Sequence, residues 1–388
     1  IKKDAKFENV GQWKRPWYYP INNENLHEAV QRESKAARNS AGILDASTLG
    51  KIDIQGSDAS EFLNRVYTNA WSKLGIGKCR YGLMLNEDGM VYDDGVTTRL
   101  GENHYLMTTT TGGAANVLSK LEDYLQTEWP ELDVYLTSVT DHYSTASICG
   151  PNSKKILKKL FPNKDFSDEA FPHMSYQDAI IDKIECRIMR ISFTGELSYE
   201  INVESKYGKS LWENCIAAGE EYKITPYGTE TMHLLRAEKG FIIVGQDTDA
   251  TMTPIDLQMD WIVSKKKYDF IGKRSLYRSD TIKEEKSYQG LQMSEINPVM
   301  KLIIRGKKRN FLSAVGKSLN MVLPAKANTS TQSEKLTALW LSPDEWMIFS
   351  NDVVKKNTNS YETEILLNKN ISKLNLGAVV DVTDQYVR

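Results

Sequence analysis

The sequence predicts an α+β fold made of two related α+β halves, followed by a smaller C-terminal α+β segment. Between residues 51 and 129, strand-like and amphipathic helical stretches follow the order strand, helix, hairpin, strand, helix. A similar order recurs from about residue 143 onward. Mixed antiparallel strands with helices between them are typical of α+β domains, and the repetition of the order indicates two related halves.

The elements of the first half follow from the spacing of apolar residues and from capping signals. An aromatic, proline-broken stretch (11–20) predicts an extended arm, because proline restricts the residue before it. A helix is predicted over 26–42, with Gly42 as its C-terminal cap. The further elements are a strand (51–56), a helix that begins at a capping Ser57 (57–67), a hairpin (81–85 and 90–100), a strand (104–111) and a helix (112–129).

The second half and the domain boundaries follow from the same patterns. The expected elements are a strand (143–149), a helix (153–161), a hairpin (186–203) and two helices (207–222 and 229–239). Composition changes after about residue 280, where the polar stretch 279–289 predicts a linker. The sequence therefore predicts an N-terminal arm (1–25), a main domain (26–289) and a C-terminal segment (290–388) that contains a strand-like stretch (336–350).

Composition and missing motifs exclude several classes of function. The 49 basic residues nearly balance the 51 acidic residues, so no general field attracts nucleic acid or an anionic membrane. No GxGxxG, GxxxxGK[ST], HxxxH or GxSxG pattern occurs, which disfavours nucleotide loops, a zinc site and acyl-transfer hydrolysis. The four cysteines are expected to be core thiols in a reducing cytoplasm. There is no apolar run of membrane-spanning length and no leader, and the start at Ile1 suggests a piece of a longer protein.

The stretch GMVYDDG (89–95) places two aspartates inside a predicted strand, where aspartate is uncommon. Because side chains alternate along a strand, Asp93 and Asp94 point to opposite faces and do not form a carboxylate pair. Asp93 is expected on a polar face with Thr97 and Arg99. Asp94 is expected on the more apolar face, with Tyr92, Val96 and Leu100. Asp94 is then either a structural residue that accepts backbone hydrogen bonds or a base whose pKa burial raises toward neutrality.

Two further stretches contain candidate ligand-binding residues. Glu200 lies in a predicted strand, on the face of Ser198 and Asn202, where a solvated residue and a ligand-binding carboxylate remain alternatives. The stretch TTTTGG (108–113) puts hydroxyl groups at the end of a strand and glycines at the start of a helix. Free amides at that position favour a polar ligand, although β-propensity and helix capping explain the same residues.

Several motifs occur together and in a fixed order. They are GQWKRPWYYP, HEAVQRESKAARNSAGILDASTLGKIDIQG, KCRYGLMLNEDGMVYDDG, YLMTTTTGG, ISFTGELSYEINV, ITPYGTETMHLLRAEKGFIIVGQDTD and DWIVSKKKYDFIGKRSL. This series, over residues 8–289, resembles the folate-binding aminomethyltransferase family, typified by the T-protein of the glycine cleavage system. Within the family it is most similar to the folate domain of the α subunit of heterotetrameric sarcosine oxidase.

The resemblance implies roles for particular residues. Asp94 matches the acidic residue beside the reactive folate nitrogens, and Glu200 matches the glutamate that anchors the pterin ring. Further residues of the implied folate pocket are Tyr81, Leu49, Thr109 and Gln246. The upstream arginine of the T-protein GARD segment is absent from GTETMHLLRAE, which fits the oxidase-type members better. The family's C-terminal β-barrel does not follow residue 289. Residues 290–388 instead resemble the start of the sarcosine oxidase γ subunit, through FLSAVGKSL, LWLSPDEWMIF and AVVDVTDQ.

The function implied by the resemblance is tetrahydrofolate-dependent one-carbon transfer in a sarcosine oxidase complex. The imine from sarcosine oxidation would be trapped as 5,10-methylenetetrahydrofolate, with release of glycine. Tetrahydrofolate is then the cofactor of this chain, whereas FAD, FMN or NAD belongs to other regions or to flavin-containing partner subunits. Two alternatives remain open: a free-standing folate-dependent aminomethyltransferase or demethylase, and a non-catalytic assembly subunit with a vestigial folate site.

Overall fold

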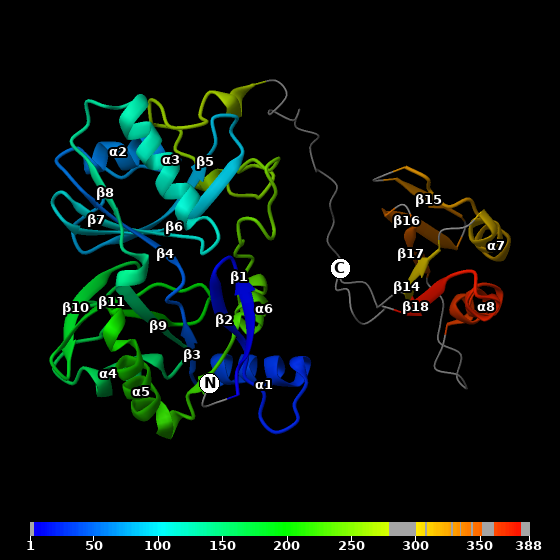
Figure 1. The fold of residues 1–388 in the computed structure, drawn as a ribbon, viewed down its shortest axis with the longest axis horizontal. Coiled ribbons are helices and arrows are strands. Elements are labelled where there is room, and N and C mark those ends of the chain that lie inside the picture. Colours follow the sequence, from blue (N-terminus) through cyan, green and yellow to red (C-terminus); the bar gives the residue numbers. More distant parts are fainter. Residues whose placement is uncertain are drawn as a thin grey trace. The chain divides into compact units, whose positions relative to one another are not determined.

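A computed structural model describes residues 4–278, 300–306, 309–326, 329–333, 335–342, 344–350 and 361–381 (Figure 1). The chain divides into two compact units, Ile1–Lys286 and Ser287–Arg388, and each is considered by itself. The predicted linker (279–289) and the boundary predicted near residue 290 lie outside the described residues. None of the helices in the described ranges is long and apolar enough to span a membrane.

The first half of the larger unit is a five-stranded sheet with the order β5-β6-β7-β4-β8. Its strands are β4 (Gly50–Gln55), β5 (Cys79–Leu85), β6 (Val91–Gly101), β7 (His104–Thr109) and β8 (Tyr135–Ser138). Two helices, α2 (Ala59–Val66) and α3 (Ala114–Thr127), pack on one face of this sheet through Phe62, Leu63 and Val117. The observed elements match the predicted strand, helix, hairpin, strand and helix within a few residues.

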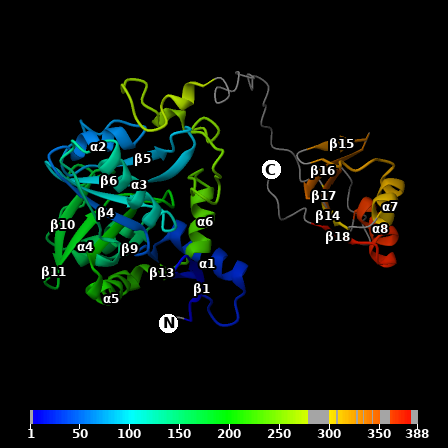
Figure 2. The same ribbon diagram turned by 45° about the horizontal axis from the view of Figure 1, so that its top comes forward.

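The second half is a six-stranded sheet with the order β10-β11-β12-β9-β3-β13. Its strands are β3 (Gly42–Asp45), β9 (Tyr143–Cys149), β10 (Tyr176–Ile181), β11 (Ile184–Met189), β12 (Ser198–Glu204) and β13 (Thr225–Pro226). Helices α4 (Ser153–Leu160) and α5 (Gly208–Gly219) cover one face (Figure 2). Along the chain, β4-α2-β5-β6-β7-α3-β8 is followed by β9-α4-β10-β11-β12-α5-β13, which confirms the two predicted related halves.

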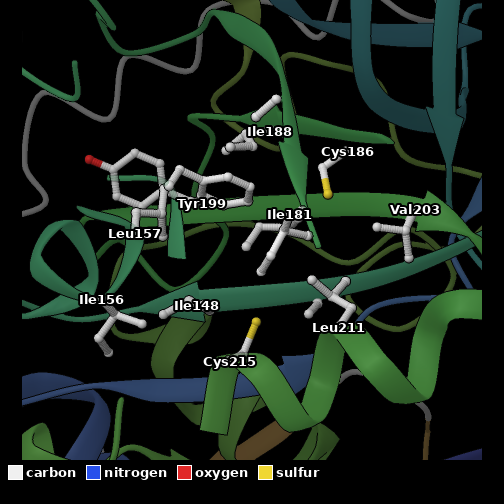
Figure 3. Close-up of a cluster of buried hydrophobic side chains, with 14 of the residues drawn as sticks. Ile148, Ile156, Leu157, Ile181, Cys186, Ile188, Tyr199, Val203, Leu211 and Cys215 are labelled. Carbon is white, nitrogen blue, oxygen red and sulfur yellow. The ribbon is translucent and has the colours of Figure 1, made fainter. Parts of the chain in front are cut away.

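The helix-covered face of the second sheet carries the apolar residues of its strands. Ile148, Ile188, Tyr199 and Ile201 are fully buried there, and Leu211 and Cys215 of α5 pack against them (Figure 3). Because side chains alternate along β12, Ser198, Glu200 and Asn202 point to the opposite face, as predicted. All four cysteines are buried free thiols, which confirms their assignment to the core.

The two sheets meet through the faces that their helices leave open. Cys79 and Leu106 of the first sheet form one buried cluster with Met189 and Ile191 of the second half. Between the sheets, the Thr98 hydroxyl also donates to the sulfur of Met189 at 3.7 Å. The arrangement is therefore helices, sheet, sheet, helices, and polar side chains on the inner faces are held between the two halves.

The N-terminal arm is extended, as predicted, and forms a hairpin of β1 (Lys6–Val10) and β2 (Trp13–Tyr18). It packs against α6 (Thr229–Ala237), where the indole of Trp17 donates to Glu230 at 2.8 Å. The fully buried Glu33, on α1 (Leu26–Asn39), fastens the arm to the start of α6. Its carboxylate accepts bonds from Tyr19 N (2.7 Å), Gly228 N (3.0 Å) and the Thr231 hydroxyl (2.6 Å).

We expect Glu33→Gln to lower the free energy of unfolding by about 1–3 kcal/mol. The carboxylate faces three donors, whereas an amide replaces one acceptor oxygen by an NH₂ group and leaves the Tyr19 N–H facing another donor. Urea unfolding measures the loss, and amide exchange should quicken at Tyr19. The exposed Glu122→Gln on α3 is the control, expected within about 0.5 kcal/mol of wild type. Equal stability of both variants would remove Glu33 from this role.

Three local predictions need correction. Gly42 does not cap α1, which ends at Asn39; it begins β3, where a Cβ would approach the Tyr227 ring to 2.8 Å. Ser57 does not cap α2, because its hydroxyl donates to Asp133 at 2.9 Å and the N-cap is Asp58. Strands β3, β8, β10 and β13 were not predicted. β3, β8 and β13 pair with strands that are far away in the sequence, whereas β10 forms a hairpin with the adjacent β11.

The smaller unit is a five-stranded sheet with the order β15-β16-β17-β14-β18. Its elements are β14 (Met300–Arg305), α7 (Arg309–Leu319), β15 (Ser330–Gln332), β16 (Leu336–Ser342), β17 (Glu345–Ser350), α8 (Glu362–Asn370) and β18 (Ala378–Asp381). The helices pack on one face of the sheet through Phe311, Val315 and Leu367. The unit has the predicted α+β character, and the end of the motif AVVDVTDQ lies outside the described residues.

Candidate active site

Asp93 and Asp94 lie in β6 and project to opposite faces of the first sheet. In the β5–β6 ladder, Asp94 pairs with Leu83 and Asp93 pairs with Met84. Leu83 packs on the side away from α2 and α3, whereas Met84 packs on the helix side. Asp94 therefore faces the side on which the second sheet also lies, and the expectation that the two aspartates form no pair is confirmed.

The polar environment expected for Asp93 is wrong. Its side chain is only 1% exposed and lies beneath the start of α3, with Oδ1 accepting bonds from Asp94 N (2.9 Å) and Thr110 N (3.4 Å). Burial raises its pKa to about 7. The β6 ladder also shifts register between Asp93 and Val91, which places Tyr92 with the helix-side cluster and not with Asp94. The local sequence predicts that the Asp93 face of β6 is polar and exposed. In the structure α2 and α3 cover that face, so both faces of β6 are apolar.

Asp94 has the properties of a candidate base. Burial is the main cause that raises its pKa, to about 6, and a hydrogen bond from the Tyr81 hydroxyl, at 2.7 Å, opposes the rise. Tyr81 lies on the neighbouring strand β5, so it holds one oxygen of the carboxylate in a fixed direction. In the described part of the chain, that hydroxyl is the one side-chain partner of the Asp94 carboxylate, which leaves further acceptor capacity open.

Glu200 occupies the corresponding inner face of the second sheet. It lies in β12 between Met189 of β11 and Ser147 of β9. Its carboxylate has no hydrogen-bond or ion-pair partner among the described residues. Burial raises its pKa to about 7, and the charge of Lys51 opposes this shift. Glu200 is half-buried, and a partly desolvated carboxylate without protein donors has acceptor capacity for a ligand, so Glu200 is a binding candidate.

Lys51 is a site residue that the sequence analysis missed. It lies in β4, pairs with Thr108 and is 2% exposed. Its neighbour Ile52 packs on the helix side, so Lys51 projects to the face of Asp94. Burial lowers its pKa to about 8, against the opposing charges of Glu200 and Asp45. The alternation KIDIQ could have indicated an inward-facing lysine, but lysine is rarely buried and the pattern alone does not show which face is covered.

The other residues predicted for the folate pocket, Leu49, Thr109 and Gln246, do not all lie on the inner faces. Leu49 is half-buried in the segment between β3 and β4, which joins the two sheets. Thr109 is 2% exposed and alternates with Thr108, so its hydroxyl points away from the face of Asp94. Gln246 is exposed, in a loop whose Ile242 and Val244 pack beside Leu83. The structure thus brings Tyr81, Asp94 and Glu200 to the inner faces, but not the Thr109 side chain.

These inner faces suit a ligand that brings N–H donors. The carboxylate of Glu200, without a partner among the described residues, can accept two N–H groups. Asp94, with one partner, suits a position beside an amine that gains or loses a proton. Within the described ranges, no group of three or more His, Cys, Asp or Glu side chains is placed to hold a metal ion. Fold and site together define a class of α+β proteins with two half-buried acidic side chains on the facing sides of paired sheets.

Comparisons with known proteins agree with this class. The model of the GCVT N-terminal domain matches residues 1–267. The chain therefore belongs to that family of folate-binding aminomethyltransferases. It is 31% identical to an aminomethyltransferase of Thermoanaerobacter pseudethanolicus over 278 residues, which cover 71% of this chain and 73% of the relative. A solved glycine cleavage system aminomethyltransferase T from Bartonella henselae shares the fold, with a TM-score of 0.62, 22% identity and coverage of 90% and 87%.

Higher identity is found to longer proteins. The chain is 60% identical to the sarcosine oxidase subunit alpha of Corynebacterium sp. (strain U-96) over 285 residues, and 46% identical to that of Rhizobium meliloti over 280 residues. These matches cover 73% and 71% of this chain but only 29% and 28% of the relatives. The chain thus corresponds to less than a third of the length of these subunits.

Proposed function

We propose that this chain performs tetrahydrofolate-dependent one-carbon transfer as part of a sarcosine oxidase complex. The observation that carries the proposal is the placement of Asp94 and Glu200 on the inner faces of the two sheets, neither neutralised by an ion pair in the described residues. The high identity to sarcosine oxidase α subunits supports the choice of complex.

Glu200 is the anchor in this proposal. Its two oxygens accept the ring N–H and the exocyclic N–H of the pterin, and these charge-assisted bonds replace the water that the carboxylate loses. Tyr81 and the half-buried Leu49 contribute to the wall of the pocket, Gln246 lies in a loop beside it, and Thr109 contributes through its backbone position. The role of the protein is to hold the folate so that its amines lie beside Asp94.

Asp94 is the proton carrier. Tetrahydrofolate supplies two amine nitrogens that take up the methylene carbon of the iminium ion formed from sarcosine. Two C–N bonds form, the C=N bond to glycine is lost, and the two amine protons end on the glycine nitrogen. Asp94 accepts a proton from the folate amine and returns it to the departing nitrogen, and Tyr81 keeps its carboxylate oriented.

The oxidation of sarcosine is assigned to other parts of the complex. The sequence contains no flavin or dinucleotide motif, so FAD, FMN or NAD would reside in flavin-containing subunits or in regions that the longer relatives carry. A hetero-oligomer in the reducing cytoplasm, with transfer of the imine between sites, completes the proposal. The free thiols are compatible with that compartment.

Calorimetric titration of the full chain with tetrahydrofolate tests the proposal. Specific, saturable binding is expected, and it should be lost or strongly weakened in Glu200→Gln. A scaffold with a vestigial site would give no specific heat. Co-purification with a flavoprotein then separates the oxidase component from a free-standing transferase, which would bind folate but recover no flavin-containing partner.

A further inference from the structure

Lys51 is enclosed between the two sheets although it carries a charge. It is 2% exposed and projects from β4 to the face that carries Asp94. A buried ammonium group is costly unless its hydrogens find acceptors. Two acceptors are the carbonyl oxygens of Ser47 and Leu49, each 3.0 Å from Nζ. Both belong to the segment that leads from β3 in the second sheet to β4 in the first.

The ammonium group retains one unused donor. It has three hydrogens, and the described residues supply acceptors for two of them. Asp45 and Glu200 are the acidic groups that act on Lys51. Oδ1 of Asp45 is already engaged by the backbone N–H (3.0 Å) and the hydroxyl (2.6 Å) of Ser47. Glu200 has no such donors, so Lys51 and Glu200 are polar groups of opposite charge whose hydrogen-bonding capacity is incompletely used.

We propose that Lys51 is a specificity-determining residue, which donates its third N–H to the 4-oxo oxygen of the pterin ring while Glu200 accepts the adjacent ring N–H and 2-amino group. The inference rests on the proposed folate function and deepens it. The edge of a 2-amino-4-oxopterin presents one acceptor followed by two donors. A cation and a carboxylate whose charges act on each other, as those of Lys51 and Glu200 do, are complementary to that sequence of acceptor and donors.

The pairing predicts which ligands the site rejects. A 4-amino analogue replaces the acceptor at position 4 by a donor, which would face the ammonium group of Lys51 and leave two donors opposed. It also turns the N–H at ring position 3 into an acceptor facing Glu200, but that change is the same in wild type and in the Lys51 variants. If Lys51 only holds the carbonyl groups of Ser47 and Leu49 together, it does not contact position 4 of the ligand. Its replacement would then change the affinity for both ligands by the same factor. Ligand discrimination therefore separates a recognition role from a structural one.

The test measures dissociation constants for tetrahydrofolate and for tetrahydroaminopterin, its 4-amino analogue, by anaerobic calorimetry on the full chain. In Lys51→Met, we expect tetrahydrofolate to bind at least about tenfold more weakly and the 4-amino analogue to bind equally well or better. The ratio of the two constants should thus shift by about tenfold or more in favour of the analogue. Lys51→Gln keeps an N–H donor without the charge and should give an intermediate ratio of the two dissociation constants. It replaces Lys51→Met in the test if the Met variant does not fold.

A matched control is Lys267, another largely buried lysine, whose Nζ donates to three backbone carbonyls, including that of Asn69 at 3.1 Å. Lys267→Met should lower the melting temperature but leave the ligand ratio unchanged. Parallel weakening of both ligands in the Lys51 variants, with a constant ratio, would overturn the inference and leave the folate function standing. Failure of wild type to bind either ligand would instead overturn the proposed function, and the inference with it.

Discussion

Replacing Asp94 by asparagine is expected to lower the formation of 5,10-methylenetetrahydrofolate by about 10²–10⁴-fold while leaving the affinity for tetrahydrofolate nearly unchanged. Asparagine has the same shape, and its carbonyl oxygen can still accept the bond from the Tyr81 hydroxyl. It cannot take up a proton at neutral pH. The loss should therefore fall on the chemical step and not on binding.

The measurement uses the assembled complex and follows where the carbon of sarcosine goes. Sarcosine oxidation should continue in Asp94→Asn, but the one-carbon unit should appear as formaldehyde and no longer as methylenetetrahydrofolate. With a pKa of about 6, the base of the wild type becomes protonated below that pH, so transfer should decline as the pH falls through about 6. The asparagine variant should lack this inflection.

Asp93→Asn is the matched control. It changes the neighbouring carboxylate, which is also buried and also has a raised pKa, but which projects to the helix side of the sheet. Its Oδ1 can be replaced by the amide oxygen, which still accepts the bond from Asp94 N. We expect less than about a tenfold change in transfer. Equal losses in the two variants, or normal transfer in Asp94→Asn, would contradict the assignment.

Replacing Glu200 by glutamine is expected to weaken tetrahydrofolate binding by roughly 10–100-fold, the equivalent of about 1.5–3 kcal/mol for a hydrogen bond to a charged group. Glutamine offers one acceptor and one donor to a ring edge that presents two donors. Calorimetry at pH of about 8 measures the effect. Binding by wild type should also weaken as the pH falls below about 7, where Glu200 becomes protonated, and the glutamine variant should show a flat profile there.

The stability of the Glu200→Gln variant shows whether its weaker folate binding comes from the lost carboxylate or from misfolding. The pKa of Glu200 is raised from 4.5 in the unfolded chain to about 7 in the folded chain. Such a group destabilises the folded state progressively as the pH rises from about 4.5 to about 7. Glutamine has no charge to bury, so the variant without ligand should melt no lower than wild type at pH of about 8. A variant that melts far lower, or that binds folate as tightly as wild type, would rule out Glu200 as the anchor.

Local periodicity was sufficient to predict most helices and strands, and to predict which side chains share a face of a single strand. The separation of Asp93 from Asp94 and the inward direction of Glu200 follow from alternation, which is a property of the extended backbone itself. The repeated order of elements indicated two halves, and the order of the motifs indicated the family. Conversely, β3, β8 and β13 were missed, because such short strands are stabilised mainly by pairing with distant partners.

The environment of each site residue could not be predicted in the same way. The expected polar face of Asp93 is buried because α2 and α3 cover it, and the register shift at Tyr92 separates that residue from Asp94. Thr109 was predicted to line the folate pocket, but the pairing of β4 with β7 turns its hydroxyl away from the inner face. Lys51 was not predicted as a site residue, because nothing near it in the sequence shows that its side chain is buried.

The sequence by itself determined that this protein is an α+β chain of two related halves in the folate-binding aminomethyltransferase family, and which aspartate to examine first. Only the tertiary structure decided that Lys51 is buried on the inner face that carries Asp94, and that its charge acts on Glu200. The physical reason is that alternation and helical spacing are local, whereas the covering of a face and the meeting of two sheets depend on contacts between residues as far apart as Lys51 and Glu200.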